Sequence, residues 1–305
     1  MIIGLDGRVI MQQQLELGAF GHTSGILEDI AAGTEKLISK ADIDPDRTVG
    51  IGVGFTGIVD RSNGIVILGS RLPEWQNTPI RPFFQKRLDL PVFVENNSHA
   101  MLLGEARFGV GAGRKNLFGL LLDAGIGSGV LMNGRLCAGH PYTAGGIGHT
   151  TIMPSGPVCY CGKRGCLQVF ASESAIGASA IRMTKSGAEK VKARINESND
   201  HRALVREVVA AARQEVTACQ QILVDAAHHL GMSLSSVVNI INPEMIIFNN
   251  SPVFSYEPVM ETIRTTILRE TYASDLSIPE LAVSHLGENA CAIGAAASVL
   301  ENTFG

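Results

Sequence analysis

The sequence predicts an α/β protein with a largely parallel sheet and two lobes. Short apolar runs typical of buried strands alternate with amphipathic helical stretches along the chain. With 305 residues, 45% of them hydrophobic, the chain can bury one large core or two ordinary ones. We expect an N-terminal lobe over residues 1–110 plus 288–305 and a C-terminal lobe over residues 111–287. Ligands of such sheets bind beyond the carboxyl ends of the strands.

Composition and charge exclude several classes of protein. A formal net charge of -4 offers no broad attraction to a phosphate backbone, so the chain should not bind DNA through its overall field. No apolar run is long enough to span a bilayer, and the first ten residues lack the charged start and apolar core of a signal peptide. We therefore expect a cytoplasmic protein without a membrane partner.

The first third of the chain sets up this alternation. Turn residues and apolar runs predict a hairpin over 4–10, one buried strand over 48–60 ending in a glycine turn, and a strand over 91–94. Helical spacing of apolar residues predicts helices over 80–88 and 99–108, and a helix from Ser24 to Lys40 with Ser24 as its N-cap. Gly57, near the end of the strand over 48–60, allows a ligand or another backbone to approach closely; a crowded turn without a ligand is equally compatible.

The rest of the chain continues the pattern. It predicts strands over 117–122, 245–248 and 281–284. It also predicts helices over 175–184, 259–268 and 290–300, and two helices in the stretch that starts at 203, the second continuing to about 241. The stretch from Lys185 to Asp200, rich in charge and small residues, is expected to be an exposed connection.

Polar residues follow the strand predicted over 91–94. Glu95, Asn96, Asn97 and Ser98 stand at its carboxyl end, directly before a helix. Polar side chains there are well placed for a ligand. The alternative is an N-cap supplied by Asn97 or Ser98, and the two roles do not exclude each other.

A glycine loop follows the strand over 117–122. Gly125, Gly127 and Gly129 alternate between this strand and the next, and a turn of this kind exposes backbone N–H groups that can cradle a phosphate. No helix opens at the third glycine, so the loop is not a Rossmann fingerprint. On these residues alone a plain hairpin turn is favoured.

The stretch 145–166 predicts a structural zinc site. His149 precedes a tight cluster of Cys159, Cys161 and Cys166, and the intervening glycines let the backbone fold round a point. Three thiolates and one imidazole form a closed tetrahedral set that suits zinc and leaves no position for a reactive water. The alternatives are free cysteines in a loop and, less favoured, a disulfide scaffold, because such scaffolds are shorter and denser in cysteine.

Taken together, these motifs resemble the ROK family of repressors, open reading frames and sugar kinases. The resemblance covers GIGVGFTGIVDRSNG, LPEW, VFVENNSHAMLLGEARFG, AGIGSGVLMNGRL, AGGIGH, CYCGKRGCLQ and NPEMII. It implies an actin-like (ribonuclease H-like) ATPase fold of two domains, a sugar in the cleft, zinc beside it, and homodimers or homotetramers.

Three family carboxylates are replaced in this sequence. Where a ROK kinase resembles this chain at Glu95-Asn96 it continues with Asp, the general base; here the residue is Asn97. A carboxamide binds a hydroxyl but cannot take its proton. The family's sugar-binding Glu of the AGE-x-GH motif is Gly146, and the Glu after the last zinc cysteine is Gln168. The resemblance therefore implies no catalytic residue.

The nucleotide side departs from the kinases as well. Ala124 replaces a phosphate-contacting Thr, Asn249-Asn250 replaces a Gly-Gly turn, and the phosphate loop with its strand, expected ahead of Gly4, is missing. That leaves Gly125, Gly127 and Gly129 as a degenerate phosphate loop, and ATP is not expected as a ligand. We interpret the missing strand as the sign of a longer parent protein, or of a gap that another chain segment fills.

The favoured function is a sugar-sensing, regulator-like ROK protein that is inactive as a kinase, a pseudokinase acting through effector binding and oligomerisation. Its expected contacts with a sugar or sugar-phosphate effector are Asn96, Asn97, His149 and Gln168, with one ring nitrogen of His149 on zinc and the other on a sugar hydroxyl. DNA would be reached only through a missing N-terminal extension or a partner. The alternatives are an ATP-dependent hexose kinase and a decayed product without a ligand.

Overall fold

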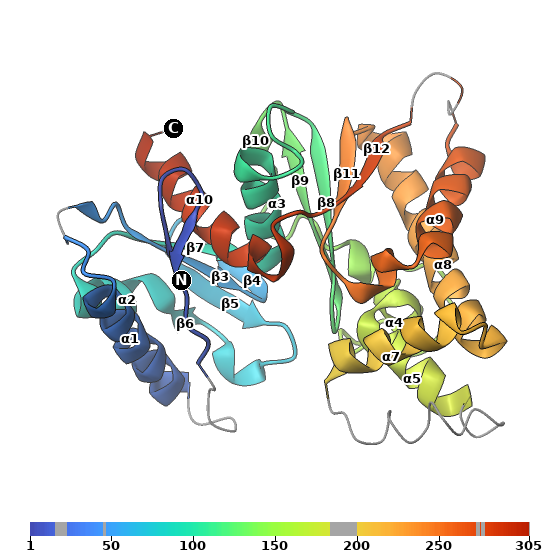
Figure 1. Ribbon diagram of the computed structural model, residues 1–305, viewed down its shortest axis with the longest axis horizontal. Helices are drawn as coiled ribbons and strands as arrows, with labels where there is room; N and C mark the ends of the chain where they lie inside the picture. The colour runs from blue at the N-terminus through green and yellow to red at the C-terminus, as the bar shows by residue number, and fades with distance from the viewer. Residues whose placement is uncertain (16–22, 45–46, 184–199, 273–274, 276–277, 305) are drawn as a thin grey trace. The chain divides into compact units, whose positions relative to one another are not determined.

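The computed structural model describes residues 1–15, 23–44, 47–183, 200–272, 275 and 278–304 (Figure 1). The chain divides into unit 1, comprising Met1–Arg114, Gly129–Ala144 and Leu286–Gly305, and unit 2, comprising Lys115–Ser128 and Gly145–His285. The connection expected over 185–200 lies outside the described residues except for Asp200. The alternating strands and helices confirm the α/β class.

Unit 1 contains short sheets. An N-terminal hairpin pairs β1 (Ile2–Ile3) with β2 (Val9–Met11). The strand β3 (Ile51–Phe55) pairs in parallel with β7 (Val92–Asn96), and an antiparallel sheet has the order β4 (Gly57–Asp60), β5 (Ile65–Gly69), β6 (Thr78–Pro79). The expected N-terminal hairpin is confirmed.

Helices of unit 1 pack on these strands. They are α1 (Thr23–Lys40), α2 (Ile80–Leu88), α3 (Asn97–Phe108) and α10 (Ala290–Phe304), with single 3₁₀ turns η2 (Pro73–Trp75) and η6 (Gly287–Asn289). An apolar core lies between α1, α2 and the strands, with Trp75 and Phe84 buried in it. The small-residue helix α10 packs against α3 and β3.

Three expected details of unit 1 were wrong. The strand over 48–60 is two strands, because Gly57 has a φ of +138° and a Cβ there would lie 2.1 Å from the Leu68 carbonyl oxygen. The helix over 99–108 begins at Asn97, and its N-cap is Asn96 rather than Asn97 or Ser98. Ser24 lies inside α1, which begins one residue earlier.

Unit 2 contains most of a larger sheet. Its order is β10 (Arg135–Leu136), β9 (Ile126–Met132), β8 (Leu117–Leu122), β11 (Met245–Phe248), β12 (Glu280–Val283). The strands β8, β11 and β12 are parallel and β10 pairs antiparallel with β9. The chain passes from unit 2 to unit 1 within β9, after Ser128.

Helices and one loop between η3 and α4 complete unit 2. The helical elements are η3 (Ile147–His149), α4 (Gln168–Ala171), α5 (Glu173–Met183), α7 (His201–Arg213), α8 (Thr217–Ile241), η5 (Pro252–Ser255) and α9 (Glu257–Glu270). The loop between η3 and α4 carries the predicted cysteine cluster. In the described part of the chain, none of the helices has the length and apolar character needed to cross a membrane.

Candidate functional site

The loop between η3 and α4, residues 150–167, is the cysteine loop, and its glycines shape it. Gly162 and Gly165 have φ values of +87° and +67°, a region that favours glycine. A Cβ on Gly165 would lie 1.6 Å from the Met153 carbonyl oxygen, so two backbone segments touch there. A short bridge between Thr151 and Cys166 closes the loop. The backbone therefore brings residues that are far apart along the loop to one point.

At that point the four predicted zinc ligands gather. The ligand atoms of His149, Cys159, Cys161 and Cys166 all lie within 4.8 Å of one another. The Sγ atoms of Cys161 and Cys166 are 3.7 Å apart, and Cys159 Sγ is 3.8 Å from His149 Nδ1. Thiolates bound tetrahedrally at ~2.3 Å from zinc stand roughly 3.8 Å apart. The donor set and its spacing both fit a zinc ion.

Burial affects the protonation of the cluster's side chains. Cys159 and Cys166 are buried, and Cys161 is exposed. Burial and the neighbouring thiols raise the pKa of Cys166 to about 12, so without a metal this thiol keeps its proton. Burial, together with Lys163, lowers the pKa of His149 and favours the neutral imidazole that ligates metals. Zinc would release a proton on binding and offset the charge of the thiolates.

Two side chains orient the cluster from outside. Gln168, 3% exposed, places its Nε2 2.9 Å from Cys159 Sγ and donates to the sulfur. The Tyr160 hydroxyl lies 3.3 Å from His149 Nε2, and the two rings meet edge to face. The ring nitrogen expected to face a sugar thus has a tyrosine hydroxyl beside it. The sequence did not predict the contacts of Gln168 and Tyr160 with the four clustered side chains, because the spacing of residues along the chain does not reveal such contacts.

In unit 1, the polar run after β7 is only partly available to a ligand. The Asn96 Oδ1 accepts from the N–H groups of Ser98 and His99, at 2.8 and 3.2 Å, and its Nδ2 donates to the Gly57 carbonyl at 2.6 Å. This cap fixes the start of α3. The half-buried Asn97 carboxamide has no hydrogen-bond partner among the described residues.

Glu95, two residues before Asn97, is buried and held by neighbouring groups. It is 1% exposed, pairs with Arg61, and its Oε1 lies 3.1 Å from His99 Nδ1 and accepts from the Asn96 N–H at 2.9 Å. A buried carboxylate with these partners is held by its neighbours rather than presented to a substrate. The sequence placed Glu95 correctly at a strand end. It did not predict the ion pair of Glu95 with Arg61, which lies more than thirty positions earlier in the chain.

The glycine loop is shorter than the sequence suggested. Gly125 lies in the turn, where its carbonyl accepts from the Asp123 N–H at 2.9 Å, whereas Gly127 and Gly129 lie within β9. Asn249 is buried, and its carboxamide pairs with both the N–H and the carbonyl of Leu122, at 2.8 and 2.9 Å. Asn249 thus fastens the ends of β8 and β11 together.

A buried carboxylate that the sequence did not single out lies next to this turn. The Glu173 N–H donates to the Asp123 carbonyl at 2.9 Å, and Ser251 Oγ donates to Glu173 Oε1 at 2.6 Å. Its Oε2 is buried without a hydrogen-bond partner in the described structure. Burial, followed by the nearby charge of Asp123, raises the pKa of Glu173, while the hydrogen bond from Ser251 opposes the rise. The sequence offers Ser172-Glu173-Ser174 only as a possible cap of the helix predicted over 175–184.

The structure brings one group of predicted residues together. His149, Cys159, Cys161, Cys166 and Gln168 form a single cluster in unit 2. Asn96 and Asn97 are adjacent at the start of α3 in unit 1. The histidine–cysteine cluster and the start of α3 are therefore two local sites, each defined within its own unit.

Known proteins are similar to this chain along nearly its whole length. The xylose repressor of Caldicellulosiruptor bescii is 31% identical over 97% of this chain and 73% of its own length, and the glucokinase of Thermotoga maritima is 31% identical over 100% and 94%. A ROK family transcriptional regulator described as a homolog of the E. coli MLC protein has the same fold, with a TM-score of 0.85 at 24% identity over 97% of this chain and 73% of that one. The sequence model of the ROK family matches residues 1–302, and the chain belongs to this family.

Proposed function

We propose that this chain is a sugar-responsive, regulator-type ROK protein that does not transfer phosphate. The observation that carries the proposal is Asn97, which stands where the resemblance to ROK kinases implies a catalytic Asp. An amide accepts and donates hydrogen bonds but has no basicity at any relevant pH. A protein with Asn97 there can hold a sugar hydroxyl without deprotonating it.

The neighbourhood of Asn97 supports the same conclusion. The adjacent carboxylate, Glu95, is buried against Arg61 and His99, so it is not available as a substitute base. Because the Asn97 carboxamide has no partner among the described residues, its hydrogen-bonding capacity is available to a polyol. Binding without deprotonation suits an effector site.

Charge at the glycine turn argues against nucleotide binding. The turn around Gly125 has the Asp123 carboxylate on it and Glu173 against its backbone. A phosphate group placed there would meet negative charge, with no basic residue at the turn itself to offset it in the sequence from Leu122 to Val130. ATP would therefore bind weakly at this turn.

Relatives named as xylose repressors make xylose the first candidate effector, with glucose as the second because other relatives are named as glucokinases. In this proposal the chain supplies sugar binding, a structural zinc ion at the cysteine loop and association into homodimers or homotetramers. DNA contact is made by a separate DNA-binding segment or partner.

Sugar binding is tested by isothermal titration of the zinc-loaded protein with xylose, glucose and other aldoses. We expect saturable binding of at least one aldose, and we expect Asn97→Ala to weaken it by roughly 10- to 100-fold, the loss that follows from one or two hydrogen bonds to a polar ligand. The matched control is Gln85→Ala, which removes an exposed carboxamide of α2 in the same unit and should leave the affinity unchanged.

Phosphoryl transfer is tested by an assay of ADP release over the same sugars. The proposal predicts no turnover above a mock-purified background. Turnover by the wild-type chain that disappears in Asn97→Ala would overturn it in favour of a sugar kinase. An absence of both binding and turnover would support a chain without a ligand.

A further inference from the structure

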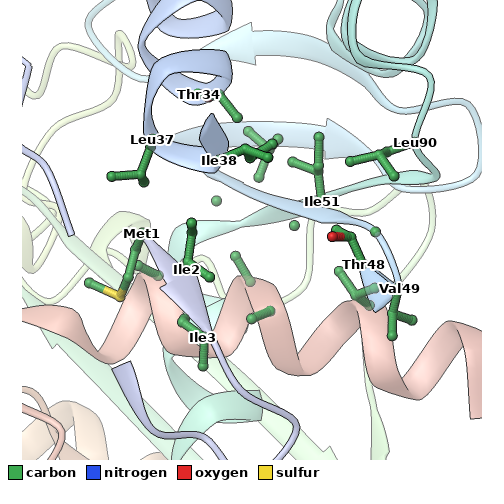
Figure 2. A pocket seen from close by; sticks show the side chains of 18 of the residues that line it. Met1, Ile2, Ile3, Thr34, Leu37, Ile38, Thr48, Val49, Ile51 and Leu90 are labelled. Atoms are coloured by element: carbon green, nitrogen blue, oxygen red, sulfur yellow. The ribbon is translucent and has the colours of Figure 1, made fainter. Parts of the chain in front are cut away.

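Unit 1 contains an apolar cavity with a volume of about 1200 Å³. Figure 2 shows side chains from three elements around it: Ile2 and Ile3 from β1, Leu37 and Ile38 from α1, and Ile51 from β3. Nothing among the described residues shows what fills this cavity. The side chain with an unassigned role lies elsewhere in unit 1, at the start of α3.

His99, in the first turn of α3, is a buried polar side chain that the proposed function does not use. It is 3% exposed, and both ring nitrogens have a partner. Its Nδ1 lies 3.1 Å from Glu95 Oε1, and its Nε2 lies 3.1 Å from the Ala144 carbonyl oxygen. A carbonyl oxygen only accepts hydrogen bonds, so Nε2 carries a proton and donates it. The ring therefore joins two segments of unit 1 that are 45 positions apart in the chain.

The first of these segments holds Asn97, the residue on which the proposed sugar site depends. The His99 N–H donates to Asn96 Oδ1 at 3.2 Å, and the Asn96 N–H donates to Glu95 Oε1 at 2.9 Å. Asn97 lies between these residues in the chain, whereas its own carboxamide has no partner among the described residues. The network thus fixes the backbone on both sides of Asn97 and leaves its amide available to a ligand.

The second segment is the loop over residues 138–144, named here the 138–144 loop. Its base is closed by the Ala144 N–H, which donates to the Ala138 carbonyl at 3.0 Å. Within it the Tyr142 N–H donates to the Gly139 carbonyl at 3.2 Å. These bonds give the loop a shape of its own, but they do not attach it to the rest of unit 1.

Two side-chain contacts attach the 138–144 loop to other parts of unit 1. The hydroxyl groups of Tyr142 and Ser62 lie 2.6 Å apart at an exposed position. The other contact is the bond from His99, whose side chain is buried, so water competes less for it. The loop continues directly into Gly145–His149, whose last residue is an expected sugar contact. Fixing the loop therefore fixes the point where this segment begins.

We propose that His99 is a positioning residue of the sugar site, which acts by attaching the 138–144 loop to the start of α3. The inference rests on the proposed sugar site and adds a residue outside the expected contacts. His99 acts through the Ala144 carbonyl and through the backbone around Asn97, without touching the sugar. With the loop already held, less conformational entropy is lost when a sugar orders the site, so the affinity is higher.

Two substitutions separate the two bonds of the ring. A glutamine amide reaches about the position of Nε2, so His99→Gln can still donate to the Ala144 carbonyl. An asparagine amide reaches only the position of Nδ1, so His99→Asn leaves that carbonyl without its donor. Calorimetric titration of the zinc-loaded protein with xylose and with glucose measures the effect. We expect an affinity within ~3-fold of wild type for His99→Gln and at least ~10-fold weaker for His99→Asn.

The matched control is His285→Asn, which changes an exposed histidine and should bind both sugars as wild type does. Hydrogen exchange of the sugar-free protein gives a second measurement that does not depend on a ligand. The amides of Tyr142 and Ala144 should exchange at least ~10-fold faster in His99→Asn than in wild type, and at the wild-type rate in His99→Gln.

The outcomes distinguish this inference from the proposed function. If the wild-type chain binds no aldose, the proposed function fails. If the wild-type chain binds xylose or glucose and His99→Asn binds it equally well, only the role of His99 is overturned. An equal loss of affinity in His99→Gln and His99→Asn would also overturn it, because His99 would then act as a core residue whose shape alone matters. Should His99→Asn fail to fold, a folded His99→Gln whose affinity falls at least ~10-fold overturns the inference, and one that keeps its affinity and its loop exchange supports it.

Discussion

At the residue scale, Gln168 contacts the cluster of His149, Cys159, Cys161 and Cys166 without supplying a ligand atom. Its amide N–H donates to Cys159 Sγ at 2.9 Å in a buried setting. Hydrogen bonds to ligand atoms orient the ligand and stabilise its charge. We predict that Gln168→Leu weakens zinc binding by about 10- to 100-fold. Competition with a chromophoric chelator measures the zinc affinity of each variant.

Gln221→Leu is the matched control for that variant. Gln221 is an exposed carboxamide of α8 in the same unit, so its loss should leave zinc affinity within experimental error. Equal zinc affinity of Gln168→Leu and the wild-type chain would contradict a role of Gln168 in holding the metal ligands.

A second prediction at this scale concerns pH and Glu173. Its folded pKa is raised by burial, so the folded state binds a proton more tightly than the unfolded state. The free energy of unfolding therefore falls as pH rises above the ordinary carboxyl pKa and through the folded value. Glu173→Gln removes this fall in the free energy of unfolding, because glutamine does not ionise. We expect a higher melting temperature than wild type at pH 7.5 and a smaller difference at pH 4.5.

Glu261→Gln serves as the comparison, because Glu261 is an exposed carboxylate of α9 in the same unit. Thermal unfolding followed by circular dichroism over pH 4.5 to 8 should give parallel curves for Glu261→Gln and wild type. A Glu173→Gln curve that also runs parallel would show that Glu173 keeps its charge in the folded state at no cost.

At the element scale, the contact between α3 and α10 depends on glycine. A Cβ on Gly294 would lie 1.6 Å from the Ala100 carbonyl oxygen, and one on Gly104 would lie 2.9 Å from the Gly294 nitrogen. Neither helix can move without disturbing β3 or β7, which they also contact. We predict that Gly294→Ala destabilises the protein by ~1–3 kcal/mol, although alanine favours helices. Denaturant unfolding measures the loss.

The control for that variant is Gly25→Ala in α1. Among the residues that the structure describes, no neighbouring atom lies within 4 Å of a Cβ at Gly25, so the substitution should be neutral or slightly stabilising. A neutral result for Gly294→Ala would mean that the two helices can separate without cost.

Elements with strong local signals were predicted well. The bounds of α2, β8 and β11 match the expectations over 80–88, 117–122 and 245–248, because apolar runs flanked by turn residues mark them. The break between β3 and β4 was missed, since it arises where Gly57 meets the backbone of β5, which is a contact between strands. The start of α3 was placed two residues late, because Asn96 rather than its successors supplies the cap.

At the scale of the whole molecule, stability should respond to metal removal. The cluster of His149, Cys159, Cys161 and Cys166 joins η3, the cysteine loop and the start of α4. An ion bound only in the folded state adds its binding free energy to folding. We predict that a strong chelator lowers the melting temperature by at least ~5 °C and that added zinc restores it.

The variant Cys166→Ser separates this effect from nonspecific action of the chelator. Cys166→Ser removes one expected zinc ligand. The melting temperature of this variant should therefore be lower than that of the wild-type chain and should not change when chelator is added. Cys219→Ser removes a buried cysteine of α8 outside the cluster and should remain sensitive. Equal chelator responses of Cys166→Ser and wild type would contradict the metal assignment.

The sequence by itself determined the α/β class, most helices and strands, and the grouping of one histidine with three cysteines at the cysteine loop, because each depends on residues close together in the chain. Family membership followed from the same ordered motifs. Only the tertiary structure decided that Gln168 faces Cys159, that Ser251 meets Glu173, and that β1, α1 and β3 surround a cavity. Those features arise where segments distant in sequence pack together, and burial then sets the charge and the partners of each side chain.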